Sequence, residues 1–135
     1  MKQYLTTFPR ASCHDYFKSQ FVWFILCWSA STDGDNWNWH GLTDRWDFTD
    51  PTVNPCLDNW QGLTCNSNCS SIVSSNCIVE EIILDSYNLN GTLPIELFQM
   101  TELASLDLGH NRLYSTIPSE TGQMGILSAL YLNNN

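Results

Sequence analysis

Apolar residues recur through the second half of the chain with one fixed step, which separates Val79 from Leu103 and Leu103 from Leu127. A repeat of roughly 20–50 residues is typical of solenoid arrays, in which each unit packs its apolar side against its neighbours. The pattern therefore predicts a stacked array over residues 78–135, with two complete repeats and a third that is cut short. Two further sets match at the same step: Ile82, Leu106 and Leu130; Leu84, Leu108 and Leu132.

Each repeat opens with a stretch in which every second side chain is apolar. In the first repeat Ile82 and Leu84 alternate with Glu81, Ile83 and Asp85, which is the pattern of a β-strand with one buried face. Since each turn of the array closes within one repeat, the strand must end in a tight turn. We expect parallel strands, one from each repeat.

Polar and proline residues follow the same step after each strand. Asn111 lies where its side-chain amide can bond the backbone of the turn, and Asn135 holds the same position in the next repeat, whereas Tyr87 replaces it in the first. Pro94 and Pro118 suit the return side, where no ladder hydrogen bond is needed. Residues 96–100 predict a short helical turn.

The first half of the chain lacks this period and predicts a different structure. Residues 16–28 are apolar on most faces and favour one buried helix, although residues 21–28 could alternatively be the core of a signal peptide. Residues 33–60, rich in Asp, Asn, Trp and Pro, predict an irregular packed loop. We therefore divide the chain into a cap over residues 1–77 and repeats over residues 78–135.

Two kinds of motif resemble those of plant-type leucine-rich-repeat proteins. Leu89-Asn90-Gly91-Thr92-Leu93-Pro94 and its counterpart in the next repeat, residues 113–118, are similar to the family's L-x-G-x-I-P signature. Residues 55–65, with Cys56, a W-x-G and a T-C, are similar to the N-terminal cap that precedes the repeats, and residues 31–37 to its entry segment. Ser115 in place of Gly and Tyr87 in place of Asn depart from the pattern.

The resemblance covers residues 16–135 and implies a fold and a function class. The fold is α/β: a curved right-handed leucine-rich-repeat solenoid with a concave parallel sheet, preceded by a helical, disulfide-bonded cap. The function is non-catalytic recognition of a protein or peptide ligand by that face, in an exported protein of the extracellular space or secretory pathway. The alternative within the family is a secreted inhibitor of a cell-wall-degrading enzyme. We expect the chain to be a fragment of a longer receptor-like protein, able to associate through an uncapped C-terminal end.

Six cysteines favour disulfides and an oxidising compartment. The resemblance implies a Cys56–Cys65 bond, and Cys69–Cys77 would then close an inserted loop. The pairing of Cys13 and Cys27 stays open. A zinc site at Cys65, Cys69 and Cys77 lacks a fourth ligand at a standard spacing.

The formal net charge of −9 limits the classes of partner that the chain is expected to bind. It argues against nucleic acid and against anionic membrane surfaces, which both need clustered Lys and Arg. The acidity serves either solubility or a basic partner. The chain has no run of 18 apolar residues, and this predicts no membrane span within it.

The exposed side of the predicted sheet is the candidate binding face. Its positions by alternation are Glu81, Ile83, Asp85, Ser105, Asp107, Gly109, Ala129, Tyr131 and Asn133. We expect Asp85 and Asp107 to stack on neighbouring strands about 4.8 Å apart, with a basic partner group, or water and salt, between them. Tyr131 is of the residue type enriched at binding hot spots.

No motif in the sequence predicts catalysis, a cofactor or a metal. Residues 33–38 begin like a calcium loop but lack the Gly and a ligand that an EF-hand requires. The histidines show no metal or catalytic spacing. Asn68 and Asn90 each begin an N-x-S/T glycosylation acceptor.

Overall fold

The structure is a computed structural model that describes residues 54–69 and 77–135. The predicted helix over residues 16–28, Cys13 and Cys27 lie outside the described residues. The described elements, in chain order, are β1 (Leu63–Cys65), β2 (Val79–Ile83), β3 (Asn90–Gly91), η2 (Ile95–Gln99), β4 (Ser105–Asp107), β5 (Arg112–Leu113), η3 (Ser119–Gln123) and β6 (Ala129–Tyr131).

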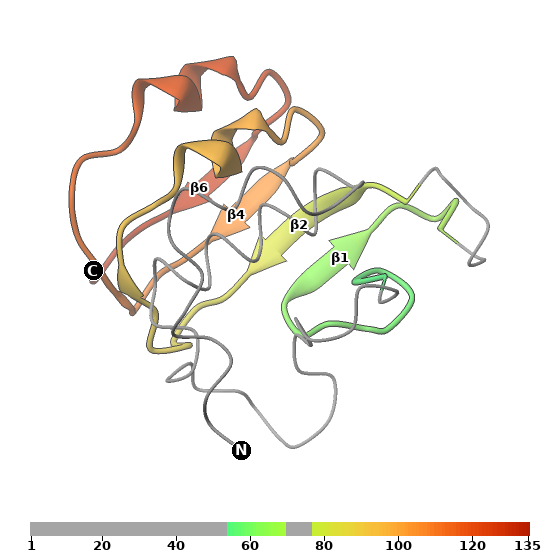
Figure 1. The fold of residues 1–135 in the computed structure, drawn as a ribbon, viewed down its shortest axis with the longest axis horizontal. Helices are drawn as coiled ribbons and strands as arrows, with labels where there is room; N and C mark the ends of the chain where they lie inside the picture. The colour runs from blue at the N-terminus through green and yellow to red at the C-terminus, as the bar shows by residue number, and fades with distance from the viewer. Residues whose placement is uncertain (1–53, 70–76) are drawn as a thin grey trace, which may run out of the picture.

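Four strands form the main sheet, in the order β1-β2-β4-β6 (Figure 1). Strands β2, β4 and β6 are parallel, and the repeat step sets their register, with Ile82 opposite Leu106 and Leu106 opposite Leu130. The sheet is mixed rather than wholly parallel, because β1 from the cap runs antiparallel to β2. Strand β1 was not predicted, because its three residues are too few to show an alternation.

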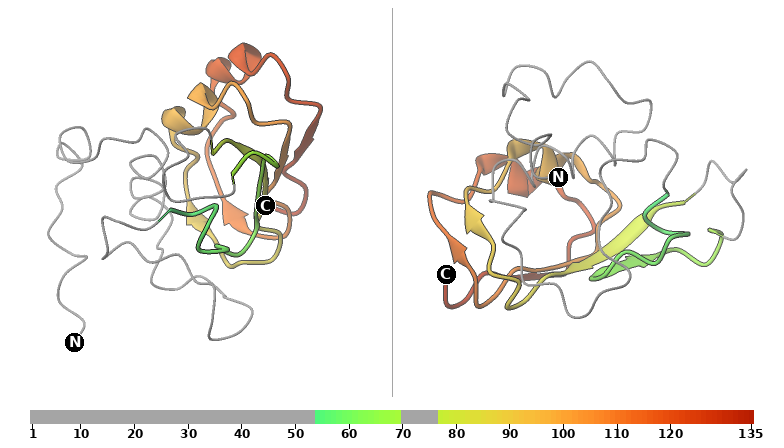
Figure 2. Two further views of the ribbon diagram at one scale, coloured as in Figure 1. Left: turned by 90° about the vertical axis from the view of Figure 1, so that its right-hand side faces the viewer. Right: turned by 60° about the horizontal axis from the view of Figure 1, so that its bottom comes forward.

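The return side of each repeat carries a short strand and a 3-10 helix. Strands β3 and β5 form a second, two-stranded parallel sheet. The 3-10 helices η2 and η3 lie side by side on the opposite side of the core from the main sheet (Figure 2).

The predicted helical turn at residues 96–100 is therefore present as η2, in 3-10 form, and the described residues contain no α-helix. The described part of the expected α/β fold thus consists of strands and 3-10 helices, and the helix expected in the cap lies outside the described residues. Each segment is five residues long and follows a proline, and 3-10 helices are typically this short. Within the described ranges no helix has the length and apolar character needed to cross a membrane.

The core lies between the main sheet and the 3-10 helices. The apolar positions of the repeat fill it, and Leu97 and Phe98 of η2 close it from the return side. Its fully buried side chains are Ile82, Leu84, Leu89, Leu97, Phe98, Leu103, Leu106 and Leu108.

Asn111 closes the turn after β4, as the spacing predicts. Its buried amide nitrogen lies 2.8 Å from the carbonyl of Leu84, 3.0 Å from that of Leu108 and 2.9 Å from that of Gly109. Its side-chain oxygen accepts the Leu89 N–H at 2.9 Å. One side chain thus ties two successive repeats together, because it bonds backbone groups of both.

The same arrangement recurs at Asn135 and is replaced at Tyr87. Asn135 donates to the carbonyls of Leu108 and Leu132 and accepts the Leu113 N–H. Tyr87 is buried, and its hydroxyl donates to the side-chain oxygen of Gln61 at 3.4 Å. The first repeat therefore uses this position for packing against the cap.

The cap joins the first repeat through a close backbone contact at Gly62. The Ile83 N–H donates to the Gly62 carbonyl at 2.7 Å, and Trp60, two residues earlier, is 3% exposed and belongs to the core. Disulfides Cys56–Cys65 and Cys69–Cys77 are the two pairs expected from the sequence.

Candidate functional site

The nine predicted face residues form three rows across β2, β4 and β6 and the residues just after them. The first row is Glu81, Ser105 and Ala129, and the central row is Ile83, Asp107 and Tyr131. The third row, two residues further along each strand, is Asp85, Gly109 and Asn133. The alternation that defines the core therefore also sets the residues of the opposite, outer face.

The outer face carries both apolar and polar side chains, and other described residues do not cover it. Ile83 is 45% exposed and Tyr131 is 52% exposed, so two large apolar side chains stand on it in the same row. Asp85, Ser105, Asp107 and Ala129 are half-buried, and Gly109 is buried. A sheet face of this kind can bind a partner by both apolar contact and charge.

The expectation that Asp85 and Asp107 stack directly on neighbouring strands is wrong. The register places Asp107 between Ile83 and Tyr131, whereas Asp85 aligns with Gly109. The reason is that the repeat step leads from Asp85 to Gly109, and Asp107 lies two residues before Gly109.

The two carboxylates instead approach Gly109 from two sides. A Cβ built on Gly109 would lie 2.8 Å from Asp85 Oδ1, 3.3 Å from Asp107 Oδ1 and 3.2 Å from Asn133 Oδ1. A side chain at Gly109 would therefore crowd three polar groups of the outer face at once.

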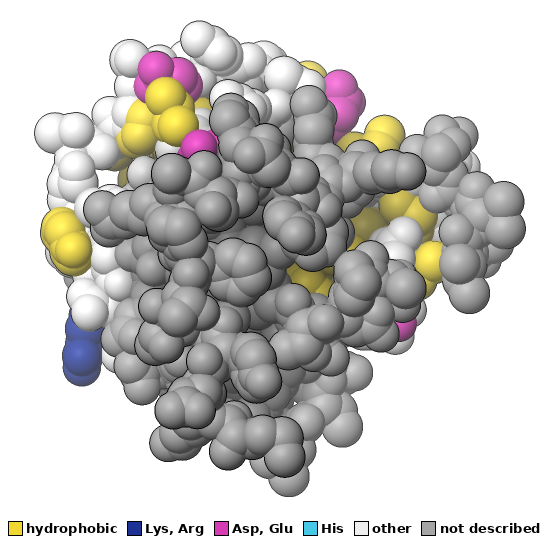
Figure 3. All heavy atoms as spheres, in the orientation of Figure 1, with side chains coloured by type: hydrophobic (Ala, Val, Ile, Leu, Met, Phe, Trp, Pro, Cys, Tyr) yellow, Lys and Arg dark blue, Asp and Glu magenta, His cyan; other side chains and the backbone are white. Residues whose placement is uncertain are grey.

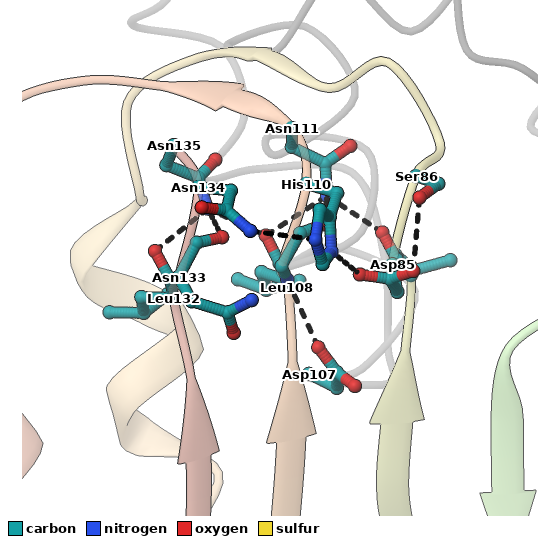
Figure 4. A network of polar contacts seen from close by, with 12 residues as sticks. Asp85, Ser86, Asp107, Leu108, His110, Asn111, Leu132, Asn133, Asn134 and Asn135 are labelled. Carbon is teal, nitrogen blue, oxygen red and sulfur yellow. Dashed lines mark hydrogen bonds and ion pairs between the residues drawn. The ribbon is translucent and has the colours of Figure 1, made fainter.

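His110, one of the histidines without metal or catalytic spacing, is the partner of Asp85 (Figure 4). Its Nδ1 lies 2.7 Å from Asp85 Oδ1, and Ser86 Oγ donates to the other carboxylate oxygen at 3.0 Å. The hydrogen bond from His110 lowers the pKa of Asp85 below its ordinary value, although burial of the carboxyl acts in the opposite direction.

The other ring nitrogen of His110 faces an amide. Asn134 Nδ2 lies 2.7 Å from His110 Nε2. An amide nitrogen only donates, so Nε2 accepts and Nδ1 carries the proton that points to Asp85. Ser86, His110 and Asn134 occupy the same position in successive repeats, and all have positive φ (63°, 49° and 57°). That shared turn conformation is what brings them together.

Asp107 is held differently, by backbone. Its Oδ1 accepts the Gly109 N–H at 3.0 Å (Figure 4). Among the described residues no side chain donates to its second oxygen. The carboxylate is thus oriented through one oxygen and can accept a further hydrogen bond through the other.

The described part of the chain is strongly acidic. Arg112 on β5, in the other sheet, is the only Lys or Arg within it. Figure 3 shows the acidic side chains spread over the described surface and the basic colour confined to one edge. The described acids are Asp58, Glu80, Glu81, Asp85, Glu96, Glu102, Asp107 and Glu120. The outer face therefore carries negative charge, and no Lys or Arg of the described residues lies on it.

The described ranges offer little support for metal binding or for catalysis. No group of three or more His, Cys, Asp or Glu side chains there could hold a metal ion. A cavity of about 300 Å³ lies beside the Cys56–Cys65 disulfide, and the described residues that line it, Trp60 and Thr64 among them, include no acid or base. The described part of its lining therefore supplies no group for general acid–base chemistry.

Both predicted glycosylation asparagines are exposed. Asn90 lies on β3, away from the main sheet, with Thr92 of its acceptor motif half-buried. Asn68 precedes the disulfide-bonded Cys69, and Ser70 of its motif lies outside the described residues.

Comparisons with known proteins agree on one class. No protein-family model matches the chain. Receptor-like protein 3 of Arabidopsis thaliana is 30% identical over 120 residues, which are 89% of this chain and 13% of that protein. A probable leucine-rich repeat receptor-like protein kinase of Arabidopsis thaliana is 33% identical over 70% of this chain and 10% of its own. The nodulation receptor kinase of Pisum sativum is 40% identical over 48% of this chain and 7% of its own.

A solved structure gives the same result for the fold. The leucine-rich-repeat ectodomain of the receptor kinase SOBIR1 from Arabidopsis thaliana matches 87% of this chain and 55% of its own, with a TM-score of 0.60 and 20% identity. At that identity the likeness shows the fold alone. The chain spans no more than 13% of the length of the curated relatives named above.

Proposed function

Since this chain belongs with the plant leucine-rich-repeat receptor-like proteins, we propose that it is a non-catalytic module that binds a protein or peptide ligand on the outer face of its main sheet. The observation that carries this proposal is the central row, where exposed Ile83 and Tyr131 flank Asp107 in register. Exposed aromatic and aliphatic side chains beside a charge are what recognition surfaces use.

Further features support the setting of that module. Two disulfides suit an oxidising, extracellular environment. Parallel strands on one side and 3-10 helices on the other suit a curved solenoid, in which the outer face of the sheet is the concave surface. We propose that the chain acts within a longer, exported receptor-like protein. No specific observation on the described residues favours the alternative of an enzyme inhibitor.

A peptide selection tests the proposed binding face. The full chain, produced with its disulfides, is used to select ligands from a displayed library of random peptides. Selected peptides are then measured against Ser105→Tyr, which places a ring in the middle of the outer face. We expect Ser105→Tyr to weaken their binding by about tenfold or more, because it removes access to the central row.

Gly122→Tyr is the matched control. Gly122 lies in η3, and a Cβ there has open space within 4 Å, so the same ring is added away from the sheet. Peptides should bind this variant as they bind the original chain. Ala129→Tyr serves as a second face variant if Ser105→Tyr does not fold. Equal loss in face and control variants, or no selected peptide at all, would overturn the proposal.

A further inference from the structure

The central row combines three kinds of contact at neighbouring positions. Ile83, Asp107 and Tyr131 are register partners on β2, β4 and β6, and neighbouring strands lie about 4.8 Å apart. An apolar side chain, a carboxylate and an aromatic ring therefore follow one another across the sheet. Side chains at such positions can touch the same ligand group.

Asp107 differs from the other acid near this row in what it can still accept. Both carboxylate oxygens of Asp85 are used, one by His110 and the other by Ser86. Asp107 uses Oδ1 for the Gly109 N–H, and its second oxygen has no hydrogen-bond donor among the described residues. The backbone bond fixes the carboxylate without neutralising its charge.

Within the described ranges, no Lys or Arg compensates the charge around this row. Arg112, the one such residue there, lies on β5 in the other sheet. Glu81 lies two residues before Ile83 on the same strand and adds a second negative charge to the face. His110 serves Asp85, so it does not offset Asp107. A partner group complementary to this row carries positive charge.

We propose that the central row binds an arginine side chain of a peptide or protein partner, an inference that rests on the proposed binding face. The guanidinium bonds the carboxylate of Asp107 and stacks on the exposed ring of Tyr131, and the aliphatic stem lies against Ile83. A planar guanidinium suits both the carboxylate and the ring, which a compact ammonium does less well.

Capped peptides of sequence Gly-Leu-X-Leu-Gly, in which X is arginine, citrulline or lysine, test this inference. Citrulline keeps the shape of arginine and removes its charge. Binding to the full, disulfide-bonded chain is followed through the methyl signals of Ile83 and the ring signals of Tyr131. We expect the arginine peptide to bind about tenfold tighter than the citrulline peptide, and lysine to fall between them.

Three variants test which side chains cause the preference for the arginine peptide. Asp107→Asn keeps an oxygen that can accept the Gly109 N–H, and should bring the arginine and citrulline peptides to nearly equal affinity. Glu102→Gln removes one exposed negative charge outside the three rows, and should leave the tenfold preference in place. Tyr131→Leu should reduce arginine binding more than lysine binding, because a stacked plane is lost.

Equal binding of the arginine and citrulline peptides, no binding of either, or an unchanged preference in Asp107→Asn would overturn the inference. Each of these results is separate from the fate of the proposed binding face. If Ser105→Tyr still blocks selected peptides while the arginine preference is absent, the face binds ligands by another chemistry and only the role of the central row is wrong.

Discussion

Asn111 shows how much of this fold depends on single side chains. It is 8% exposed, and its amide lies within hydrogen-bond distance of three carbonyls and one N–H that belong to two repeats. The Leu84 carbonyl and the Leu89 N–H have this amide as their partner, whereas the Gly109 carbonyl also accepts the Ser86 N–H. A buried backbone group without a partner is costly, so a polar residue inside the array is retained for the bonds it makes. This one amide therefore holds the turn that follows β4 against the preceding repeat.

Asn111→Ala should lower the free energy of unfolding by about 3 kcal/mol, because the Leu84 carbonyl and the Leu89 N–H lose their partner at once. Urea unfolding measures the change. Asn135→Ala is the matched control, since that amide makes the same kinds of bond but is exposed, and water can replace it. An equally small effect of both substitutions would contradict this account.

Asp85 should make stability depend on pH in the acid range. Its pKa is lowered below the ordinary 3.8, mainly by the hydrogen bond from His110. A carboxyl with a lowered pKa in the folded state stabilises the fold above its ordinary pKa, and this is lost as pH falls through the lowered value. Asp85→Asn should therefore reduce stability at about pH 6 and have less effect near about pH 2.

The cause named for Asp85 can be tested in the same series. In a His110→Ala background the effect of Asp85→Asn at about pH 6 should shrink, because the main hydrogen bond to the carboxylate is already absent. The side chain of Asp85 is 41% exposed, so solvent screens the interaction and the effect is small. A destabilisation that is the same at every pH would contradict the expectation.

At the scale of elements, the contact of β1 with β2 is the most constrained. Gly62 has φ of 77°, and a Cβ on it would lie 2.3 Å from the Ile83 carbonyl oxygen and 2.7 Å from a methyl group of Leu84. A side chain here cannot be accommodated without moving backbone. The cap strand and the first repeat therefore form one sheet only because this position is glycine.

Gly62→Ala should destabilise the protein by about 3 kcal/mol, from backbone strain and from the clash with β2. Thermal unfolding monitored by circular dichroism gives the change. Gly125→Ala is the control, since a Cβ there has open space and its effect should stay within about 0.5 kcal/mol. A tolerated Gly62→Ala would mean that β1 does not pair with β2 as described.

At the scale of the whole molecule, the prediction concerns export. If the chain passes through a secretory pathway, Asn90 should carry a glycan, because it is exposed on β3 and begins an intact acceptor motif. Asn90→Gln should then lower the apparent mass by one glycan. Thr92→Ala, which leaves the asparagine in place, should give the same loss. An unchanged mass in both variants would contradict the prediction.

Much of the fold could be predicted because the same core positions recur in each repeat. Leu84, Leu108 and Leu132 occupy one structural position, so each supports the others, and the Asn111 turn follows from where that core strand must end. The cap offered no such support. Its strand β1 has three residues and appears once, and the mixed sheet followed from a pairing that no local pattern shows.

The candidate face was predicted as a set of residues but not as an arrangement. Alternation correctly assigned Ile83, Asp107 and Tyr131 to the outer side, since a buried strand face leaves the other face no choice. The relation of Asp85 to Asp107 and the contact with His110 were not predicted. Both depend on the strand register and on the left-handed turn at Ser86 and His110.

The sequence by itself determined the repeat, its core, the turn asparagine and the residues of the outer face, because all of these follow from spacing along the chain. Only the tertiary structure decided which of those residues are neighbours. Register and turn geometry join Asp85 to His110 and set Asp107 between Ile83 and Tyr131, with one carboxylate oxygen that no described residue bonds. Contacts between repeats depend on distances in space, and a one-dimensional pattern does not contain them.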